Sequence, residues 1–307
     1  MALKLGCNAW LPGLCLAVLA MLASVASDRA AAIPFGSEEQ EHDFASRKGP
    51  RDAFDSIGRI ECHDPASSRH WVNATGWLIG DSQTIITAAH VFYRGGDSAR
   101  QRASNPLDPR SCVFLLFDRE QKLRGSFAIV QAVSPWADRR KRDDVSYDFA
   151  IARLNRPVIG AVVPRTRSAR ERAGTTRLYA LRSGRGEARM LHESEGVIER
   201  FANDRERLVV TRRFGLRISH PQLLLLTSAN TMQGSSGGMY FASGSGTAIG
   251  IHLGHLCASY RGAGSFNSLS CFNYGRFISG GVLRLVEGVQ AGRPHRPYLI
   301  RIEGERR

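Results

Sequence analysis

Three short segments carry side chains that together could perform acyl transfer. The first ends in His90 after a run of β-branched residues, the second places Asp148 at the start of an apolar strand, and the third sets Ser236 inside a glycine-rich turn. A serine hydroxyl becomes a good nucleophile when a neighbouring base takes its proton, and a histidine near neutral pKa suits that task. A buried carboxylate holds the histidine in the required tautomer. Glycines around the serine let the amides of Gly234 and Ser236 point at one oxyanion.

The order of the three residues narrows the reaction class. His90, Asp148 and Ser236 are separated by 58 and 88 residues (148 − 90 and 236 − 148). This order excludes the arrangements of subtilisins and α/β-hydrolases, which carry the same groups in other orders. Each segment alone is a common strand end or loop, so the combination carries the argument. With its TAAH, DFAI and GSSGG motifs, the chain resembles the chymotrypsin-like (trypsin-like) serine proteases over about residues 56–290.

Short apolar runs separated by turn residues predict an all-β fold of two packed six-stranded antiparallel barrels, and the resemblance implies the same fold. It also implies an active site between the barrels. Helical spacing of apolar residues predicts a C-terminal helix over about 275–290. The expected strands are 57–62, 71–79, 84–88, 113–117, 126–133 and 149–154, followed by 177–181, 196–201, 208–212, 222–227, 239–241 and 247–253.

The N-terminus has the pattern of an export signal. Lys4 precedes an apolar run over 9–25, and small residues follow, so residues 1–26 are predicted to be a signal peptide cut after Ala26. A cut after Ala32 and an uncleaved membrane anchor are the alternatives. No later segment is long and apolar enough to span a bilayer. The mature protein is therefore expected to be secreted or periplasmic.

The remaining chain divides by composition. Residues 27–52 are polar and read as a propeptide or flexible lead-in, and 53–290 form the peptidase domain. Within it we expect the first barrel over about 56–155, the second over about 165–274 and then the helix. Residues 291–307 are expected to be a solvated basic tail.

Four cysteines remain after signal removal, because two of the six lie within residues 1–26. An even count in an exported protein predicts two disulfides, for which three pairings are possible. We favour Cys62–Cys112 and Cys257–Cys271, since each pair then lies within one half of the chain. A metal site is the rival interpretation, but the Cys-x-x-Cys and His-Glu-x-x-His spacings are absent from the sequence. We expect neither a metal nor a cofactor.

The resemblance also locates a specificity pocket. Asn230 stands at its floor, six residues before the serine, where an aspartate would be needed to bind Arg or Lys. In glutamyl endopeptidases a histidine in a Gly-Ile-His segment and a nearby Thr or Ser bind an acidic side chain. His252, in its protonated form, and Thr231 would take these parts, with Gly254 in the adjacent strand. A small or apolar pocket, with His252 merely packed in its strand, is the alternative.

Two positions depart from the family pattern. Animal members carry an aspartate directly before the nucleophile, where it pairs with a newly cut N-terminus, whereas this chain has Ser235. Activation by an inserted amine is therefore not expected. Val91 follows the histidine where a cysteine is usual. The overall pattern is similar to bacterial exported members, including the glutamyl endopeptidase-like group.

The formal net charge of +14 is the unusual number in the composition. Such a surface favours anionic partners, and a third class of function, nucleic-acid binding, rests on this charge alone. The prediction is a monomeric serine endopeptidase whose partner is a polypeptide substrate, with acidic residues before the cut as one open preference. It includes no specific nucleic acid and no membrane span after signal cleavage. A catalytically silent barrel that acts as a binding module is the competing function.

Overall fold

The computed structural model describes residues 41–43, 53–63, 70–93, 105–118, 120–168, 174–182, 190–242, 246–257 and 266–301. All of them belong to one unit, residues 32–307. The predicted signal peptide and both alternative cut sites lie outside these residues. Of the lead-in over 27–52, only β1 (Glu41–Asp43) is described.

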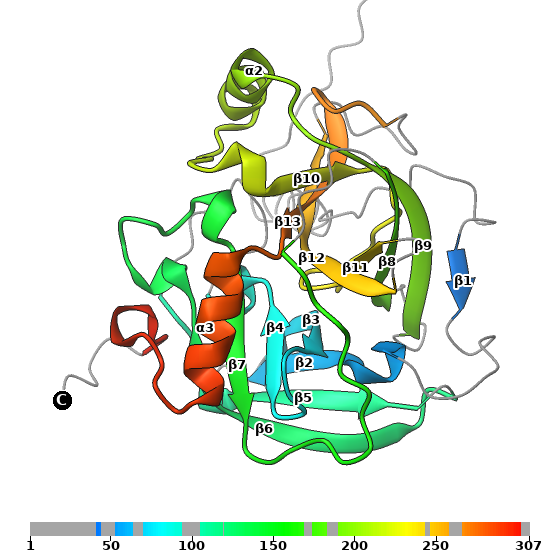
Figure 1. Ribbon diagram of the computed structural model, residues 1–307, viewed down its shortest axis with the longest axis vertical. Coiled ribbons are helices and arrows are strands. Elements are labelled where there is room, and N and C mark those ends of the chain that lie inside the picture. Colours follow the sequence, from blue (N-terminus) through cyan, green and yellow to red (C-terminus); the bar gives the residue numbers. More distant parts are fainter. Residues whose placement is uncertain are drawn as a thin grey trace, which may run out of the picture. The chain divides into compact units, whose positions relative to one another are not determined.

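Six antiparallel strands close the first barrel in the order β2-β3-β4-β7-β6-β5 (Figure 1). Buried and partly exposed residues alternate along β5, as expected for a strand with one face toward the core. All six expected strands of this half are present. They are β2 (Ile57–His63), β3 (His70–Leu78), β4 (Thr84–Thr87), β5 (Cys112–Phe117), β6 (Leu123–Val133) and β7 (Ala150–Leu154).

The second barrel follows the order β9-β10-β13-β12-β11-β8 and is closed by pairing of β9 with β8. Strand β1 adds to β9 from outside, where Glu41 to Asp43 pair with Ser194 to His192. The predicted chymotrypsin-like architecture is confirmed. The strands are β8 (Gly174–Arg182), β9 (Met190–Glu199), β10 (Leu224–Thr227), β11 (Met239–Ala242), β12 (Thr247–Cys257) and β13 (Cys271–Phe277).

Two predictions for the second half were wrong. Residues 208–212, expected as a strand, lie inside helix α2 (Asp204–Phe214), which packs on β13 through Phe214 and Phe272. The C-terminal helix α3 begins at Gly280 and ends at Gln290, so the stretch from 275 to 277 is strand and the barrel extends past 274. Strand β13 is buried along its whole length and therefore shows no alternation that the sequence could reveal.

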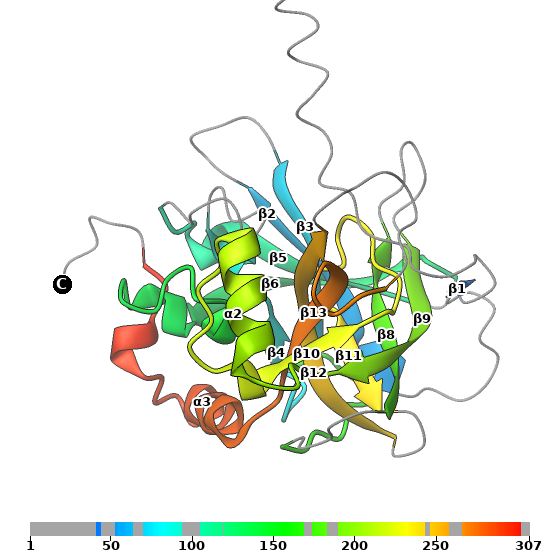
Figure 2. The ribbon, with the colours of Figure 1, turned by 90° about the horizontal axis from the view of Figure 1, so that it is seen from above.

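Helix α3 lies beside β7 and β4 of the first barrel, whereas α2 lies apart from that barrel (Figures 1 and 2). A solvated tail was predicted after α3, but residues up to 300 are bonded to the rest of the protein, so the prediction is wrong for this stretch. The Ser134 amide donates to the Tyr298 carbonyl at 2.7 Å, and the Ile300 amide donates to the Ala132 carbonyl at 3.0 Å. Neither helix of the described chain has the length and apolar character needed to span a membrane.

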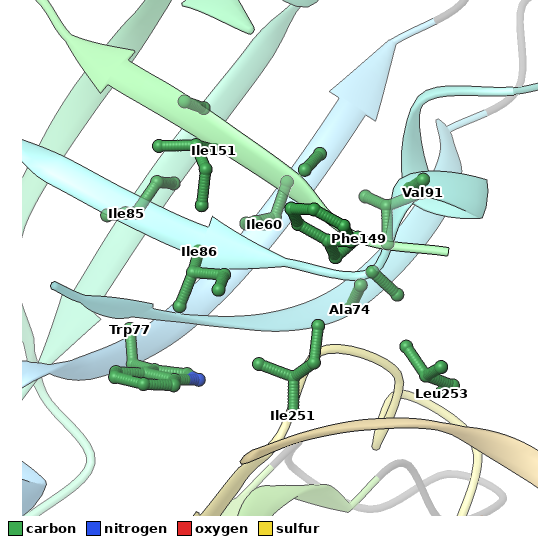
Figure 3. Close-up of a cluster of buried hydrophobic side chains, with 14 of the residues drawn as sticks. Ile60, Ala74, Trp77, Ile85, Ile86, Val91, Phe149, Ile151, Ile251 and Leu253 are labelled. Carbon is green, nitrogen blue, oxygen red and sulfur yellow. The ribbon is translucent and has the colours of Figure 1, made fainter. Parts of the chain in front are cut away.

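One hydrophobic cluster is shared by the two barrels. Trp77, Ile86 and Ile151 of the first barrel lie in the same buried cluster as Ile251 and Leu253 of β12 (Figure 3). Removing this much apolar surface from water stabilises the contact between the barrels. Since the predicted catalytic residues come from both barrels, this contact determines their relative placement.

Both favoured disulfides are present. Cys62–Cys112 joins β2 to β5 in the first barrel, and Cys257–Cys271 joins β12 to β13 in the second. Each bridge closes a loop inside one barrel. The prediction made from the even cysteine count is therefore confirmed.

Candidate active site

Pairing of β4 with β7 brings His90 to Asp148. Thr87 ends β4 and pairs with Ala150 at the start of β7, so the residues just beyond them meet at one barrel end. One Asp148 oxygen lies 2.9 Å from His90 Nδ1, and the other accepts the His90 backbone N–H at 3.0 Å. The carboxylate is only 4% exposed. It therefore directs Nδ1–H toward itself and leaves Nε2 for proton exchange.

Ser236 lies in a tight turn that enters β11. The turn requires glycine at Gly237, where φ is +85° and a Cβ atom would stand 2.0 Å from the Thr75 carbonyl oxygen. A hydrogen bond from the Gly237 amide to the His252 carbonyl holds the turn against β12, and one from the Gly238 amide to the Ser235 carbonyl closes the turn itself, each at 2.8 Å. Ser236 itself is partly exposed.

Thr75 of β3 connects this turn to the first barrel. Its amide donates to the Ser236 carbonyl at 2.8 Å, and its own carbonyl accepts from the Thr87 hydroxyl at 2.8 Å. Thr87 stands three residues before His90. The structure thus links the serine turn to the strand that carries the histidine. The Ser236 hydroxyl makes no hydrogen bond to another described residue.

From Gly234 to Gly238, the backbone of the turn leaves two amides unused. The amide of Ser235 donates to the Met232 carbonyl at 3.0 Å, and those of Gly237 and Gly238 also have acceptors. Within the described chain, the amides of Gly234 and Ser236 have no acceptor. These are the two donors expected to stabilise an oxyanion.

The four predicted pocket residues are placed as follows. Asn230 and Thr231 are each 1% exposed, and His252 is 2% exposed. The Thr231 hydroxyl donates to Asn273 Oδ1 at 2.9 Å, and a Cβ atom on Gly254 would stand 3.0 Å from the Tyr274 hydroxyl. Asn273 was not anticipated, because its strand β13 was not predicted.

His252 is paired with Tyr240. The Tyr240 hydroxyl lies 2.7 Å from His252 Nδ1, and both side chains are buried. Burial lowers the pKa of His252 well below its ordinary value, and the charges that His255, His90 and His192 would carry lower it further. Burial also raises the pKa of Tyr240 well above its ordinary value. Both groups are therefore neutral at pH 7, so the expected protonated His252 is not what the substrate-free protein contains.

Metal binding finds no support in this arrangement. Across the described ranges, no group of three or more His, Cys, Asp or Glu side chains is placed to hold an ion. The candidate site itself brings together a serine, a histidine, a carboxylate and backbone amides.

Comparison with protein families shows which family the chain belongs to. Residues 74–251 match the family model of the trypsin-like peptidase domain, which is 178 of 307 residues (251 − 74 + 1). The chain belongs to the trypsin-like peptidase family. The matched segment contains the three predicted catalytic residues His90, Asp148 and Ser236. A search of curated proteins found no match.

Solved structures share the trypsin-like peptidase fold. A glutamyl endopeptidase in complex with MPD is 14% identical, with a TM-score of 0.57 over 84% of this chain and 100% of that one. The protease Anisep from Arthrobacter nicotinovorans is 16% identical, with a TM-score of 0.51 over 82% and 99%. A scabies mite inactivated protease paralogue is 11% identical, with a TM-score of 0.53 over 83% and 97%. At these identities the likeness shows the fold alone.

Sequence reasoning missed three buried residues that hold the site of this trypsin-like peptidase, of which Thr75 joins the two barrels while Asn273 and Tyr240 bond within the second barrel. Thr75, Asn273 and Tyr240 are buried and polar, yet each stands in a strand among residues of ordinary strand composition. Their partners are distant in sequence; Thr75 and Gly234 are 159 residues apart. The sequence feature that could have revealed these residues is a polar side chain at a strand position expected to face the core.

Proposed function

We propose that this trypsin-like peptidase is a serine endopeptidase. Ser236 Oγ attacks the scissile carbonyl carbon while His90 Nε2 takes its proton, and the amides of Gly234 and Ser236 stabilise the oxyanion. His90 then gives the proton to the leaving amine as the C–N bond breaks, which leaves an acyl-enzyme. Water, activated by His90, hydrolyses the ester and restores Ser236. Asp148 orients His90 and stabilises its charged form.

The observation that carries the proposal is the pair of hydrogen bonds between the Asp148 carboxylate and His90. The two carboxylate oxygens hold the ring nitrogen at 2.9 Å and the backbone amide at 3.0 Å, so the imidazole has one orientation. A buried carboxylate that holds both the ring and the backbone of one histidine is suited to presenting that histidine in one tautomer. The bond between Ser236 and His90 would then form when substrate binds, since catalytic hydrogen bonds commonly tighten only in that complex.

For specificity we propose a preference for an acidic side chain before the cut. Tyr240 is neutral and can donate to His252 Nδ1, which leaves the histidine proton on Nε2. Within the described chain, Nε2 has no acceptor of its own. A neutral N–H donor at His252 would suit a carboxylate, whereas Asn230 stands where an aspartate would be needed to bind a basic side chain. A small or apolar pocket is the alternative.

We also propose that the chain is exported, with residues 1–26 removed. Two disulfides support an oxidising location, because such bridges form and persist outside the cytoplasm. The domain limits of 53–290 for the peptidase, preceded by a lead-in over 27–52, form part of the same proposal. The predicted monomer stays a prediction.

A catalytically silent binding module is the second candidate. One observation favours it: an inactivated protease paralogue of the scabies mite has the same fold, so the fold itself does not require activity. Retention of His90, Asp148 and Ser236 opposes it, because catalytically silent relatives usually lose one of the three. The nucleic-acid candidate has net charge as its only support.

The deciding experiment uses the full chain expressed in a secreting bacterial host. Cleavage after Ala26 would be seen as a secreted chain whose measured mass matches a protein that begins at Ser27. A fluorophosphonate probe, which reacts with activated serines, should label the wild type and not Ser236→Ala. Peptide hydrolysis should fall on the order of 10⁶-fold in this variant, because the nucleophile is lost.

Two results would contradict the proposal. Equal labelling of Ser236→Ala would show that another residue is the nucleophile. Absence of labelling in a folded wild type, also after removal of residues 27–52, would make the binding module the better candidate. Equal unfolding temperatures of the two proteins serve as the folding control.

A further inference from the structure

Thr75 lies where the first barrel meets the serine turn of the second, and its polar groups are all engaged. It is fully buried. Its hydroxyl donates to the Gly234 carbonyl at 2.8 Å and accepts from the Leu181 amide at 2.9 Å. Its amide donates to the Ser236 carbonyl, and its carbonyl accepts from the Thr87 hydroxyl, each at 2.8 Å. One residue of β3 therefore contacts both carbonyls that flank Ser235.

These contacts restrain the backbone around the two amides on which the oxyanion site depends. The unused amides belong to Gly234 and Ser236, and the Gly234 carbonyl that Thr75 holds belongs to the peptide group between the two that carry these amides. The Ser236 carbonyl, also held by Thr75, belongs to the peptide group that follows them. Gly234 has a φ of +95°, and a glycine can rotate to other backbone conformations at little steric cost. The hydroxyl of Thr75 opposes that rotation, because turning the Gly234 carbonyl would break a buried hydrogen bond.

Ser235 adds a second uncharged restraint on the turn. Its hydroxyl accepts from the Met232 amide at 3.0 Å and donates to the Leu181 carbonyl at 3.2 Å. Leu181 of β8 thus uses its carbonyl for Ser235 and its amide for Thr75. The side chains of Thr75 and Ser235 meet at the same residue of β8. This pair holds the turn from within the folded chain.

We infer that Thr75 and Ser235 are positioning residues that preset the oxyanion site of this enzyme, with Thr75 coupling the first barrel to it. This inference rests on the proposed function. Because both restraints are hydrogen bonds made by side-chain hydroxyls inside the protein, the site is formed without a charged chain terminus entering the barrel. The two hydroxyls act through the backbone of Gly234 and Ser236 and do not touch substrate.

The test compares Thr75→Val with Thr75→Ser in the full chain. Valine keeps the shape and removes the hydroxyl, whereas serine keeps the hydroxyl. We expect Thr75→Val to lower kcat about 10²-fold, comparable to loss of one oxyanion donor, with KM changed less than about threefold. Thr75→Ser should recover kcat to within about tenfold of the wild type. Thr176→Val is the matched control, because Thr176 is equally buried and its hydroxyl donates to the Phe241 carbonyl at 3.0 Å.

The outcomes separate this inference from the proposed function. If the wild type hydrolyses peptides and Ser236→Ala does not, the proposed function holds, and Thr75→Val then decides the inference. A folded Thr75→Val enzyme with wild-type kcat would overturn it, as would an equal loss in Thr75→Ser and Thr75→Val. Should Thr75→Val not fold, Ser235→Ala decides: loss of kcat at constant KM supports the inference, and unchanged kcat overturns it.

Discussion

At the scale of single residues, the pair formed by His252 and Tyr240 would determine what the proposed specificity pocket can offer a substrate. A charged histidine would attract any anion, but a buried neutral one offers a directed N–H donor. When the Tyr240 hydroxyl, 2.7 Å from Nδ1, donates to that nitrogen, Nε2 is the position of the N–H donor. Hydrogen bonds to a charged partner contribute about 1.5–3 kcal/mol, which is enough for selection of an acidic side chain.

His252→Gln tests this role through substrate choice. We expect the wild type to cleave a peptide with Glu before the cut more efficiently than its Leu counterpart. The variant should lose that preference by about 10- to 100-fold in the ratio of kcat/KM values, because a hydrogen bond to the carboxylate is lost. Steady-state kinetics on the paired peptides measures the ratio. A ratio that His252→Gln leaves unchanged would favour the small or apolar pocket.

At the scale of elements, α2 shows how local signals compete. Its apolar residues Leu208, Val209 and Val210 suit a strand, which is why a strand was expected there. The helix is determined by its ends: Asn203 accepts the Glu206 amide at 3.0 Å, and Gly215 terminates the helix at a φ of +66°. Asparagine and glycine at these positions are typical N-cap and C-cap residues.

Asn203→Ala should therefore destabilise the protein without impairing the site. Loss of an N-cap hydrogen bond lowers the free energy of unfolding by about 1 kcal/mol, which a urea titration can measure. Since α2 contributes none of the proposed catalytic residues, kcat should stay at the wild-type value. Arg205→Ala, an exposed change in the same helix, serves as the control and should shift stability by less than about 0.5 kcal/mol. Equal stability of Asn203→Ala and wild type would contradict the capping argument.

At the scale of the whole molecule, two buried systems join the barrels. The apolar cluster brings Ile251 and Leu253 of β12 against the first barrel (Figure 3). Thr75 adds hydrogen bonds between the barrels. His252 lies between those two residues in β12 and must stay neutral there. Global stability should therefore depend on the proton uptake of this one buried histidine as well as on apolar burial.

The sign of this pH dependence follows from the lowered pKa. Below about pH 6.5 the unfolded chain binds a proton at His252 that the folded chain rejects, so stability falls as pH decreases through that range. The slope for one proton is at most about 1.4 kcal/mol per pH unit. His252→Gln should remove this contribution. Urea midpoints between pH 7 and pH 5 should therefore fall less steeply in the variant, and parallel curves would rule out the contribution.

The sequence by itself determined the fold class and the strands of the first barrel, and its even cysteine count predicted two disulfides without deciding their pairing. Short apolar runs and turn residues act over short windows and need no knowledge of register. The order of His90, Asp148 and Ser236 likewise predicted the reaction class. Strand β13 was not predicted, because its uniform burial hides the alternation typical of a strand. Helix α2 was not predicted, because its capping residues outweigh the strand preference of its apolar residues.

Only the tertiary structure decided how the site is held together. The bond from Thr75 to Gly234 spans 159 residues, and the contact between His252 and Tyr240 depends on the pairing of β11 with β12. Both depend on strand register and on the packing of one barrel against the other. These are long-range properties, so no short stretch of sequence encodes them.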